Sequence, residues 1–428
     1  MFQPARGTRD FLPEEMQRRN WALDRIREVF EAYGYEPLGT PAFESWEMLK
    51  LKSGEDIINQ IYYFRDKSDR ELGLRFEWTA SLCRVVASHR ELPRPFKRYA
   101  IGPAWRYERP SEKRFREFWQ ADVDIVGVAD VIADAEVLAV AVDCFKRLGF
   151  EGFLIRLNDR RILEAFVEIA GMPKERSLDI FRAVDKLDKI GVEGVMEELA
   201  KVGASSEASS RLLELMASKG ESMAMLNKIR ETLVGSKTGL LGCNALSALT
   251  RYATAFGIEP YMVIDFSLAR GLDYYTGPVY EVYAEGFEEY GSIAGGGRYD
   301  GLIELFGSKP TPATGVSLGI ERIVPLLEKK GAFEDLDLGP SVYVASASDA
   351  VRAKAIEVAQ MLRRSGLSTD LDLMGRSLTR QLDYANRKGF KRVVIVGEKE
   401  LLEGCVSVRN METAEQQKVK LDELTDHL

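Results

Sequence analysis

The chain has 428 residues, 45% of them hydrophobic and 29% charged, which is ordinary for a globular protein and long enough for two or three domains. No apolar run reaches the roughly eighteen residues that a membrane span needs, and the N-terminal MFQPARGTRD lacks the apolar core of a signal peptide. The four widely spaced cysteines indicate reduced thiols in the cytoplasm, and a net charge of −8 argues against a general nucleic-acid coat.

Histidine is scarce, because only His89 and His427 are present. This scarcity argues against a histidine-based catalytic triad and against most catalytic zinc sites. Any chemistry is therefore expected to depend on charge and geometry.

Two segments are basic although the whole chain is acidic. Residues 90–116 hold nine arginines and lysines against three glutamates, and residues 376–392 hold six against one aspartate. Basic patches on an acidic protein favour phosphate-binding sites, whereas either patch taken alone also fits a solvated helix face.

The first third of the chain predicts a mixture of helices and strands. A helix is expected to begin near Pro13 and to end at Gly34. The runs YAIGPAWRYER and REFWQADVDIVG, joined by a charged link at 107–116, predict two antiparallel strands with a long hairpin loop. Residues 131–148 follow as a helix.

From LDIFRAVDKLDKI to about residue 255 the periodicity is almost wholly helical, which predicts a helical insertion. Strands are expected again at YMVIDFS, PVYEVYAE and SIAGGGRYDGL, before a helix at GIERIVPLLEKK. The acidic GAFEDLDLGP then predicts a linker. After it the strands SVYVAS, STDLDL and KRVVIVG alternate with helices, which predicts a separate α/β domain with parallel strands.

The run SLARGLDYYTGPVYEV places Arg270, Asp273, Tyr274 and Tyr275 among glycines between two strands. An irregular connection can direct Arg270 and Tyr275 to the same side, as a binding loop would require. The alternative is a charged hairpin loop whose tyrosines cover the edge of the sheet. The chain has no glycine-rich phosphate loop, so arginine side chains would have to hold any nucleotide phosphates.

Several motifs occur together in one order: RGTRDFLP, GYEPLGTPAFE with Pro41, LRFEWTAS, WRYERPSEKRFREFWQADVDI, RGLDYYTG, GGRYDGL and GIER. In this order they resemble the histidyl-tRNA synthetases, a family of class II aminoacyl-tRNA synthetases. The resemblance covers nearly the whole chain.

The resemblance implies an α+β fold, in which an antiparallel sheet flanked by helices forms a catalytic domain of residues 1–170 and 256–330. A helical insertion of residues 171–255, a linker of residues 331–340 and an α/β anticodon-binding domain of residues 341–428 complete the expected organisation. The motif around Pro41 implies a homodimer.

The implied reaction joins histidine to the 3′ end of its tRNA through histidyl-adenylate, with ATP as substrate. The residues implied to bind histidine are Glu77, Thr79, Arg106, Gln120, Asp124, Arg270, Tyr274, Tyr275 and Tyr299. Those implied to bind ATP are Arg106, Glu108, Phe118 and Arg322. The implied catalytic residues are Arg106, Arg270 and Arg322. Arg270 matches an arginine that replaces a metal at the α-phosphate, so no metal ligand is expected from the protein beyond the Mg²⁺ that accompanies ATP.

Two other functions share parts of this pattern. A catalytically inactive regulatory subunit of histidine biosynthesis would typically lose the arginine signature and the C-terminal domain, whereas Arg106, Arg270 and Arg322 are all present. A class II synthetase for threonine or proline would not be expected to carry RGLDYY and GGRYDG.

Overall fold

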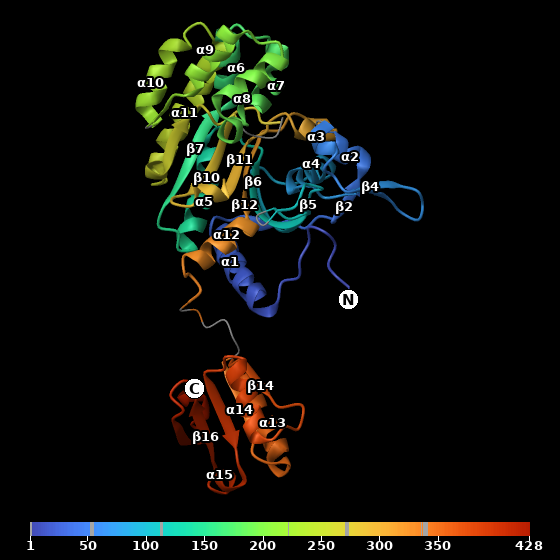
Figure 1. The fold of residues 1–428 in the computed structure, drawn as a ribbon, viewed down its shortest axis with the longest axis vertical. Coiled ribbons are helices and arrows are strands. Elements are labelled where there is room, and N and C mark those ends of the chain that lie inside the picture. Colours follow the sequence, from blue (N-terminus) through green and yellow to red (C-terminus); the bar gives the residue numbers. More distant parts are fainter. Residues whose placement is uncertain are drawn as a thin grey trace. The chain divides into compact units, whose positions relative to one another are not determined.

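The computed structural model describes residues 2–51, 55–111, 114–220, 222–269, 274–334, 336 and 341–428. The chain forms two compact units, one of Met1–Phe11 and Arg18–Phe333 and the other of Leu12–Gln17 and Glu334–Leu428 (Figure 1). Arg270 and Asp273 lie outside the described residues. No helix in the described ranges combines the length and the apolar character that crossing a membrane requires.

The larger unit is built on a sheet that has nine strands within the described residues, in the order β1-β5-β6-β12-β11-β10-β7-β9-β8. The strands, from one edge to the other, are β1 (Glu36–Pro37), β5 (Phe96–Trp105), β6 (Glu117–Val126), β12 (Ala313–Gly319), β11 (Ala294–Arg298), β10 (Pro278–Ala284), β7 (Phe153–Asp159), β9 (Met262–Asp265) and β8 (Lys219–Gly220). The six strands from β5 to β7 pair antiparallel, β1 pairs parallel to β5, and β9 pairs parallel to β7 and antiparallel to β8.

The expected hairpin of two long strands is confirmed by β5 and β6, which pair from Phe96↔Val126 to Trp105↔Glu117. The expected helix at 131–148 is α5 (Ile132–Arg147). Its run of alanine, valine and leucine leaves almost no polar face, so α5 is buried, packing on β6, β12 and α11. Other helices that pack against this sheet include α1 (Pro13–Ala32), α4 (Trp78–Ser88) and α12 (Ile320–Lys329).

A small three-stranded sheet with two short helices adjoins α4. It comprises β2 (Phe43–Ser45), β4 (Glu71–Leu74) and β3 (Tyr63–Arg65), with α2 (Trp46–Lys50) and α3 (Glu55–Ile58). Short 3₁₀ turns occur at Lys174–Arg176, Glu259–Tyr261, Glu288–Tyr290, Ile303–Phe306 and Asp349–Val351.

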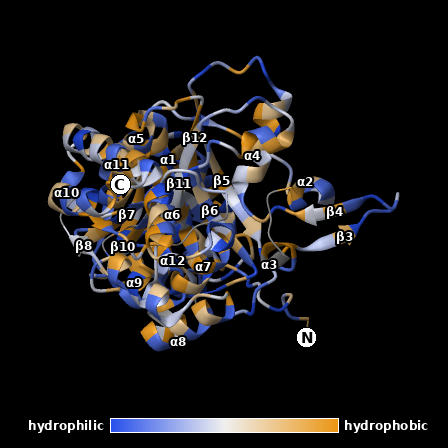
Figure 2. Cartoon of the chain, turned by 90° about the horizontal axis from the view of Figure 1, so that it is seen from above, coloured by the Kyte–Doolittle hydropathy of each residue, from blue (hydrophilic) through white to orange (hydrophobic). Residues whose placement is uncertain are grey.

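The helical periodicity after residue 178 is confirmed. The helices that cluster at one end of the sheet are α6 (Arg160–Ile169), α7 (Ser177–Val184), α8 (Leu187–Lys201), α9 (Ser206–Met216), α10 (Ser222–Thr232) and α11 (Lys237–Ala255) (Figure 1). Figure 2 shows hydrophobic and hydrophilic residues side by side along α8 and α9, as expected for helices with one buried face. Val195 and Leu199 are among the residues that α8 buries.

The smaller unit has a sheet ordered β14-β13-β15-β16-β17. Its strands are β13 (Val342–Ser346), β14 (Thr369–Leu371), β15 (Arg392–Val396), β16 (Cys405–Asn410) and β17 (Gln416–Lys420), and its helices are α13 (Arg352–Arg364), α14 (Leu378–Arg387), α15 (Glu398–Leu402) and α16 (Leu424–His427). The three strands predicted from sequence are parallel, as expected. The hairpin of β16 and β17, which is antiparallel to β15, was not predicted.

One buried ion pair ties α5 to the end of β11. Nε of Arg298 donates to Oδ2 of Asp134 over 3.0 Å, and Thr314 donates to the other carboxylate oxygen over 2.8 Å. The two side chains of the pair are only 4% and 0% exposed. Because Tyr299 follows Arg298 directly, this contact also fixes the backbone from which Tyr299 extends.

Removing one partner of this pair is expected to destabilise the larger unit. Asp134→Asn leaves the guanidinium of Arg298 buried without its counter-charge, which costs about 3–5 kcal/mol. Urea unfolding can be followed by tryptophan fluorescence, which reports the larger unit alone because Trp21, Trp46, Trp78, Trp105 and Trp119 all belong to it.

The matched control is Asp300→Asn. Asp300 also pairs with Arg298, at 3.2 Å, but its side chain is 41% exposed. A loss of less than about 1 kcal/mol is expected there. Equal losses of unfolding free energy in the two variants would contradict the prediction that Arg298 stabilises the fold mainly through Asp134.

Candidate active site

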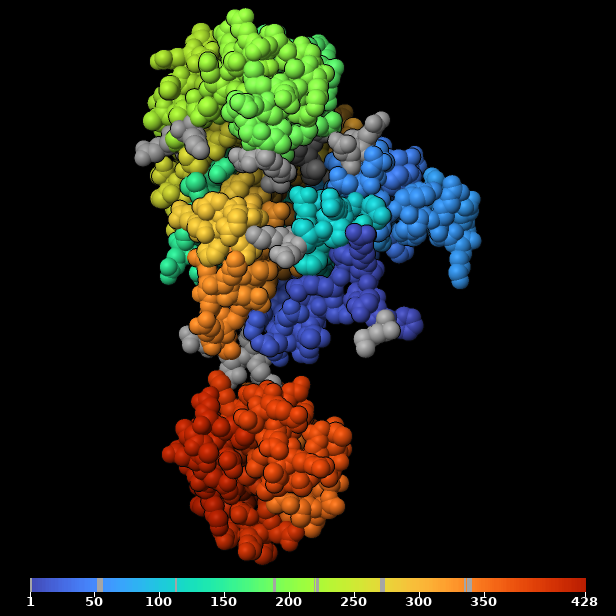
Figure 3. All heavy atoms as spheres, in the orientation of Figure 1, coloured from blue at the N-terminus to red at the C-terminus, as the bar shows by residue number. Residues whose placement is uncertain are grey.

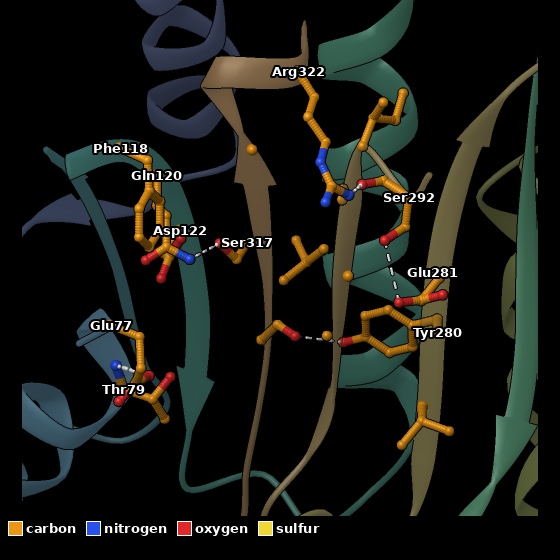
Figure 4. A pocket seen from close by; sticks show the side chains of 18 of the residues that line it. Glu77, Thr79, Phe118, Gln120, Asp122, Tyr280, Glu281, Ser292, Ser317 and Arg322 are labelled. Atoms are coloured by element: carbon orange, nitrogen blue, oxygen red, sulfur yellow. Dashed lines mark hydrogen bonds between the residues drawn. The ribbon is translucent and has the colours of Figure 1, made fainter. Parts of the chain in front are cut away.

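A pocket of about 450 Å³ opens on the face of β6, β12, β11 and β10 (Figure 4). The sequence-predicted residues that line it are Glu77, Thr79, Arg106, Glu108, Phe118, Gln120, Asp124, Tyr274, Tyr275, Tyr299 and Arg322. The structure therefore brings every predicted site residue together except Arg270, which lies outside the described residues. The two adjacent tyrosines line the pocket, so the alternative in which they only cover a sheet edge is wrong.

Glu77 is fixed in the pocket wall by the start of α4. It is the N-cap residue, and its two carboxylate oxygens accept hydrogen bonds from the backbone N–H groups of Thr79 and Ala80 over 2.7 and 2.9 Å. A negative charge is favourable at the N-terminal end of a helix, where N–H groups lack partners within the helix. Capping therefore holds a buried carboxylate beside Thr79 in a defined orientation.

Asp124 lies at the base of the pocket between a cation and a phenol. The guanidinium Nη2 of Arg98 lies 2.6 Å from Oδ2 of Asp124, and the hydroxyl of Tyr299 donates to Oδ1. Arg98 and Asp124 sit opposite each other on the paired strands β5 and β6. Burial raises the pKa of Tyr299 well above its usual value, so the phenol keeps its proton and remains a donor.

Arg98 was not predicted as a site residue. In the sequence it belongs to the basic segment 90–116, where it was counted toward a phosphate-binding patch. In the structure it is 1% exposed and pairs with Asp124, so it does not contribute to a phosphate-binding surface. The alternation of FKRYAIG along a strand was the available signal, but it does not show which face is buried.

Glycines make the floor of the pocket: Gly296 and Gly315 line it, and Gly297 lies against the ring of Tyr275. A Cβ atom on Gly315 would lie 2.1 Å from Oδ1 of Asp124, and one on Gly297 would lie 2.9 Å from the ring of Tyr275. A Cβ on Gly296 would meet the carbonyl oxygen of Gly315 at 2.0 Å. These positions on β11 and β12 must be glycine so that the carboxylate and the phenol ring can occupy the space above the sheet.

The tyrosines form one aromatic wall. The rings of Tyr274 and Tyr275 are 4.9 Å apart, and Tyr274 meets Tyr299 edge to face at 5.9 Å. Such ring pairs contribute beyond their buried area and restrict the rotation of each side chain. The wall therefore presents Tyr275 in a fixed position beside Asp124.

The other end of the pocket is cationic and aromatic. The guanidinium of Arg106 lies 4.4 Å from the ring centre of Phe76 and 4.9 Å from that of Phe118. Burial lowers the pKa of Arg106, although a guanidinium stays charged near neutral pH. Glu108 pairs with Arg114 at 2.9 Å, and Nη1 of Arg322 donates to the carbonyl of Ser292 (Figure 4).

Asp122 is a further pocket residue that the sequence argument missed. It lies on the same face of β6 as Gln120 and Asp124, because side chains two residues apart on a strand point the same way. Asp122 is 4% exposed, and its Oδ1 has no hydrogen-bond partner among the described residues. Burial raises the pKa of Asp122 to about 7, against the opposing effect of Arg98.

Comparisons with known proteins agree with this arrangement. The profile of the histidyl-tRNA synthetase family matches residues 7–323, and that of the anticodon-binding domain matches residues 341–428. The chain is 41% identical to the histidine–tRNA ligase of Pyrococcus furiosus, over 100% of this chain and 99% of that protein.

Solved structures give the same result. The crystal structure of histidyl-tRNA synthetase from Nostoc sp. PCC 7120 matches with a TM-score of 0.87 and 30% identity, covering 100% of this chain and 98% of that one. A Bacillus halodurans structure described as an ATP phosphoribosyltransferase regulatory subunit/histidyl-tRNA synthetase matches with a TM-score of 0.78 and 25% identity, covering 93% of this chain and 98% of that one.

A large, mainly antiparallel sheet flanked by helices, with a charged pocket on its face and an anticodon-binding domain, defines the class II aminoacyl-tRNA synthetases. Within that class, the profile match over most of the chain and the 41% identity over its full length show the family. The chain belongs to the histidyl-tRNA synthetase family.

The raised pKa of Asp122 predicts a pH-dependent cost to folding. The unfolded carboxyl titrates near 4 and the folded one at about 7, so between these values the folded state binds more protons. Stability is therefore lost as the pH rises toward 7 and is constant above it. Between pH 6 and pH 8 the wild type should lose about 1 kcal/mol that the isosteric Asp122→Asn variant does not lose.

The measurement is urea unfolding of both proteins at the two pH values, followed by tryptophan fluorescence. Asp122→Asn should be the more stable protein at pH 8. A stability difference between variant and wild type that is the same at pH 6 and pH 8 would show that Asp122 titrates normally.

Proposed function

We propose that the protein is a histidine–tRNA ligase, which activates histidine with ATP and transfers it to the 3′ end of its tRNA. The observation that supports this most directly is the convergence of the family's signature residues in one pocket. Glu77, Arg106, Asp124, Tyr275 and Arg322 come from four separated sequence motifs and all line it. Such convergence is expected of a working site and not of a regulatory relative that has lost catalysis.

Histidine recognition is assigned to the carboxylate end of the pocket. Asp124 and Tyr275 are proposed to hydrogen-bond the two imidazole nitrogens, with Tyr274 and Tyr299 completing the wall. Glu77, Thr79 and Gln120 are proposed to hold the α-amino group. A ligand without the ring nitrogens would leave buried polar groups unpaired, which is the strongest form of rejection.

The adenylation step needs charge stabilisation and no general base. The substrate carboxylate is already ionised and attacks the α-phosphorus of ATP, so negative charge builds up on the phosphoryl oxygens in the transition state. Fixed guanidinium groups stabilise that charge, and Arg106 and Arg270 are assigned to it. Arg322 is assigned to the distal phosphates, and Glu108 and Phe118 to adenine. ATP is bound with Mg²⁺ on its phosphates.

Arg322 and Glu108 would each have to change partners when ATP binds. Arg322 donates to the Ser292 carbonyl, and Glu108 pairs with Arg114. A phosphate anion is a stronger acceptor for a guanidinium than a neutral carbonyl is, so the exchange at Arg322 is favourable. Release of Glu108 from its half-exposed partner costs little, because exposed ion pairs contribute only about 0–1 kcal/mol.

The smaller unit is proposed to bind the anticodon end of tRNA. Arg380 and Arg387 on α14, with Lys388, Lys391 and Arg392 after it, are exposed, and Arg376 lies just before the helix. Contacts to phosphate set the register of the nucleic acid and contribute salt-dependent affinity.

The active form is proposed to be a homodimer. Phe43, Tyr63 and Phe64 on the small sheet are 51%, 44% and 36% exposed, and the sheet adjoins the segment of Pro41. Figure 3 shows this light-blue segment projecting from one side of the larger unit. Exposed aromatic residues on a projection suit burial against a second copy around a two-fold axis.

The protein is proposed to act in the cytoplasm. The four cysteines are free thiols, which suits that reducing compartment.

The function is tested by ATP–pyrophosphate exchange with each of the twenty amino acids. Histidine alone should support exchange above background, because only its ring satisfies both Asp124 and Tyr275. Comparable exchange with threonine or proline would contradict the proposed substrate. Absence of exchange with any amino acid, in a folded protein, would favour the regulatory function instead.

The division of labour is tested by ending the chain after Leu338. Every residue assigned to adenylation precedes that point, so histidine-dependent exchange should persist. Aminoacylation of tRNA should fall sharply, and the part of the tRNA affinity that is lost should be the salt-sensitive part.

Charge neutralisation in the full chain is the matched control for this truncation. Replacing Arg380 and Arg387 by glutamine should reproduce part of the loss in tRNA affinity with exchange unchanged. A truncated protein that charges tRNA as well as the full chain would contradict the assignment of the smaller unit.

A further inference from the structure

Asp122 lies between the two ends of the proposed histidine site. Gln120, Asp122 and Asp124 alternate along β6 and all line the pocket, and Figure 4 shows the first two of them. Gln120 is assigned to the α-amino group and Asp124 to the imidazole ring. Asp122 therefore occupies the stretch of wall between the groups that read the two polar ends of the substrate.

Two neighbouring acceptor atoms in this wall lack donors. Oε1 of Gln120 and Oδ1 of Asp122 are both buried without a hydrogen-bond partner among the described residues. The amide nitrogen of Gln120 donates to Ser317 over 2.7 Å, which directs the amide oxygen away from that hydroxyl. Buried acceptors without partners are rare in native proteins, and they point to a ligand that donates.

An ammonium group suits these acceptors. Arg98 forms its ion pair with Asp124 and offsets the burial of Asp122 only in part. An ammonium group supplies a positive charge and three donors, whereas water or a hydroxyl supplies no charge. Of the groups in histidine and ATP, only the α-ammonium always has this character near neutral pH.

Glu77 already has partners that Asp122 lacks. Both oxygens of Glu77 accept hydrogen bonds from the N-terminus of α4, which partly neutralises its charge. Asp122 has no such helix end, and its pKa is raised to about 7. Arg98 and a hydrogen bond with Ser317 offset the burial of Asp122 in part, and its Oδ1 still lacks a partner among the described residues, so this oxygen is available to a substrate cation.

We propose that the carboxylate of Asp122 binds the α-ammonium group of histidine, together with Oε1 of Gln120. This assignment rests on the proposed histidine–tRNA ligase function and makes Asp122 a specificity-determining residue of that site. It accounts for the two unpaired acceptors and for the position of Asp122 on β6.

The test uses the full chain and two ligands that share the imidazole ring. Histidine carries the α-ammonium group, and 3-(imidazol-4-yl)propionate lacks it. In Asp122→Asn the dissociation constant of histidine, measured by calorimetry, should rise by about 10- to 100-fold, the usual effect of losing a charge-assisted hydrogen bond. The dissociation constant of the propionate should not rise, because the lost partner is absent from it.

Asp124→Asn is the crossed control on the same strand. Asp124 is assigned to the ring, so both ligands should bind more weakly in that variant. Equal weakening of both ligands in Asp122→Asn, or weakening of neither, would overturn the role of Asp122. Failure of the wild type to bind histidine would instead overturn the proposed function, so the two results are distinguishable.

The wild type provides a second measurement that does not depend on a variant. The affinity for histidine relative to that for the propionate should fall as the pH falls from 8 to 6. Protonation of Asp122 near pH 7 removes the negative charge that binds the ammonium group. The other charged or titratable groups near Asp122 are Arg75, Glu77, Arg98, Arg106, Asp124 and Tyr275. The α-ammonium group makes the ring of histidine less basic than that of the propionate, so each affinity is first corrected for the ring titration of that ligand, measured on the free ligand by NMR. A ratio independent of pH would also overturn the proposal.

Discussion

Burial of charge is the constraint around which the larger unit is arranged. At the base of the pocket Arg98 meets Asp124, and at the end of β11 Arg298 meets Asp134, with all four side chains at most 5% exposed. Each ion loses several kcal/mol of hydration on burial, which only a close partner and further hydrogen bonds offset. Paired strands meet this requirement because they hold two backbones in fixed register. The sheet therefore fixes the positions of the polar groups in the pocket, and it does so before any ligand binds.

Much of this arrangement follows from the sequence, and the failures have a common cause. Strand alternation and the glycine-rich run predicted β5, β6 and β11, and the motifs gathered Glu77, Asp124 and Tyr275 into one site. Alternation does not reveal which face of a strand is buried. Arg98 was therefore counted with the basic segment 90–116, and Asp122 was not identified as a site residue, although both are buried. Burial is a property of the packed sheet, so it became visible only with the partners β6 and β12 in place.

The smaller unit shows more plainly which strands a hydrophobic pattern can predict and which it cannot. Its parallel strands β13 (VYVAS) and β15 (RVVIV) are buried on both faces, apart from Arg392 at the start of β15. The strand β17, in contrast, reads QQKVK, with Val419 its only buried residue. Such a strand is held by its ladder to β16 and carries little hydrophobic signal of its own. Each unit nevertheless has its own cluster of buried apolar side chains, so the pocket draws all its lining from one folded body.

The glycine floor bears on how such a site changes over evolution or in the laboratory. Binding sites are usually enlarged by trimming a side chain, but Gly296, Gly297 and Gly315 present only backbone. Nothing smaller can replace them, and anything larger displaces Asp124 or Tyr275 or strikes the next strand. The depth of the pocket is thus already at the limit that a polypeptide allows. A variant that accepts a bulkier amino acid must be sought among the aromatic and acidic walls, where it would lose the groups proposed to bind the imidazole.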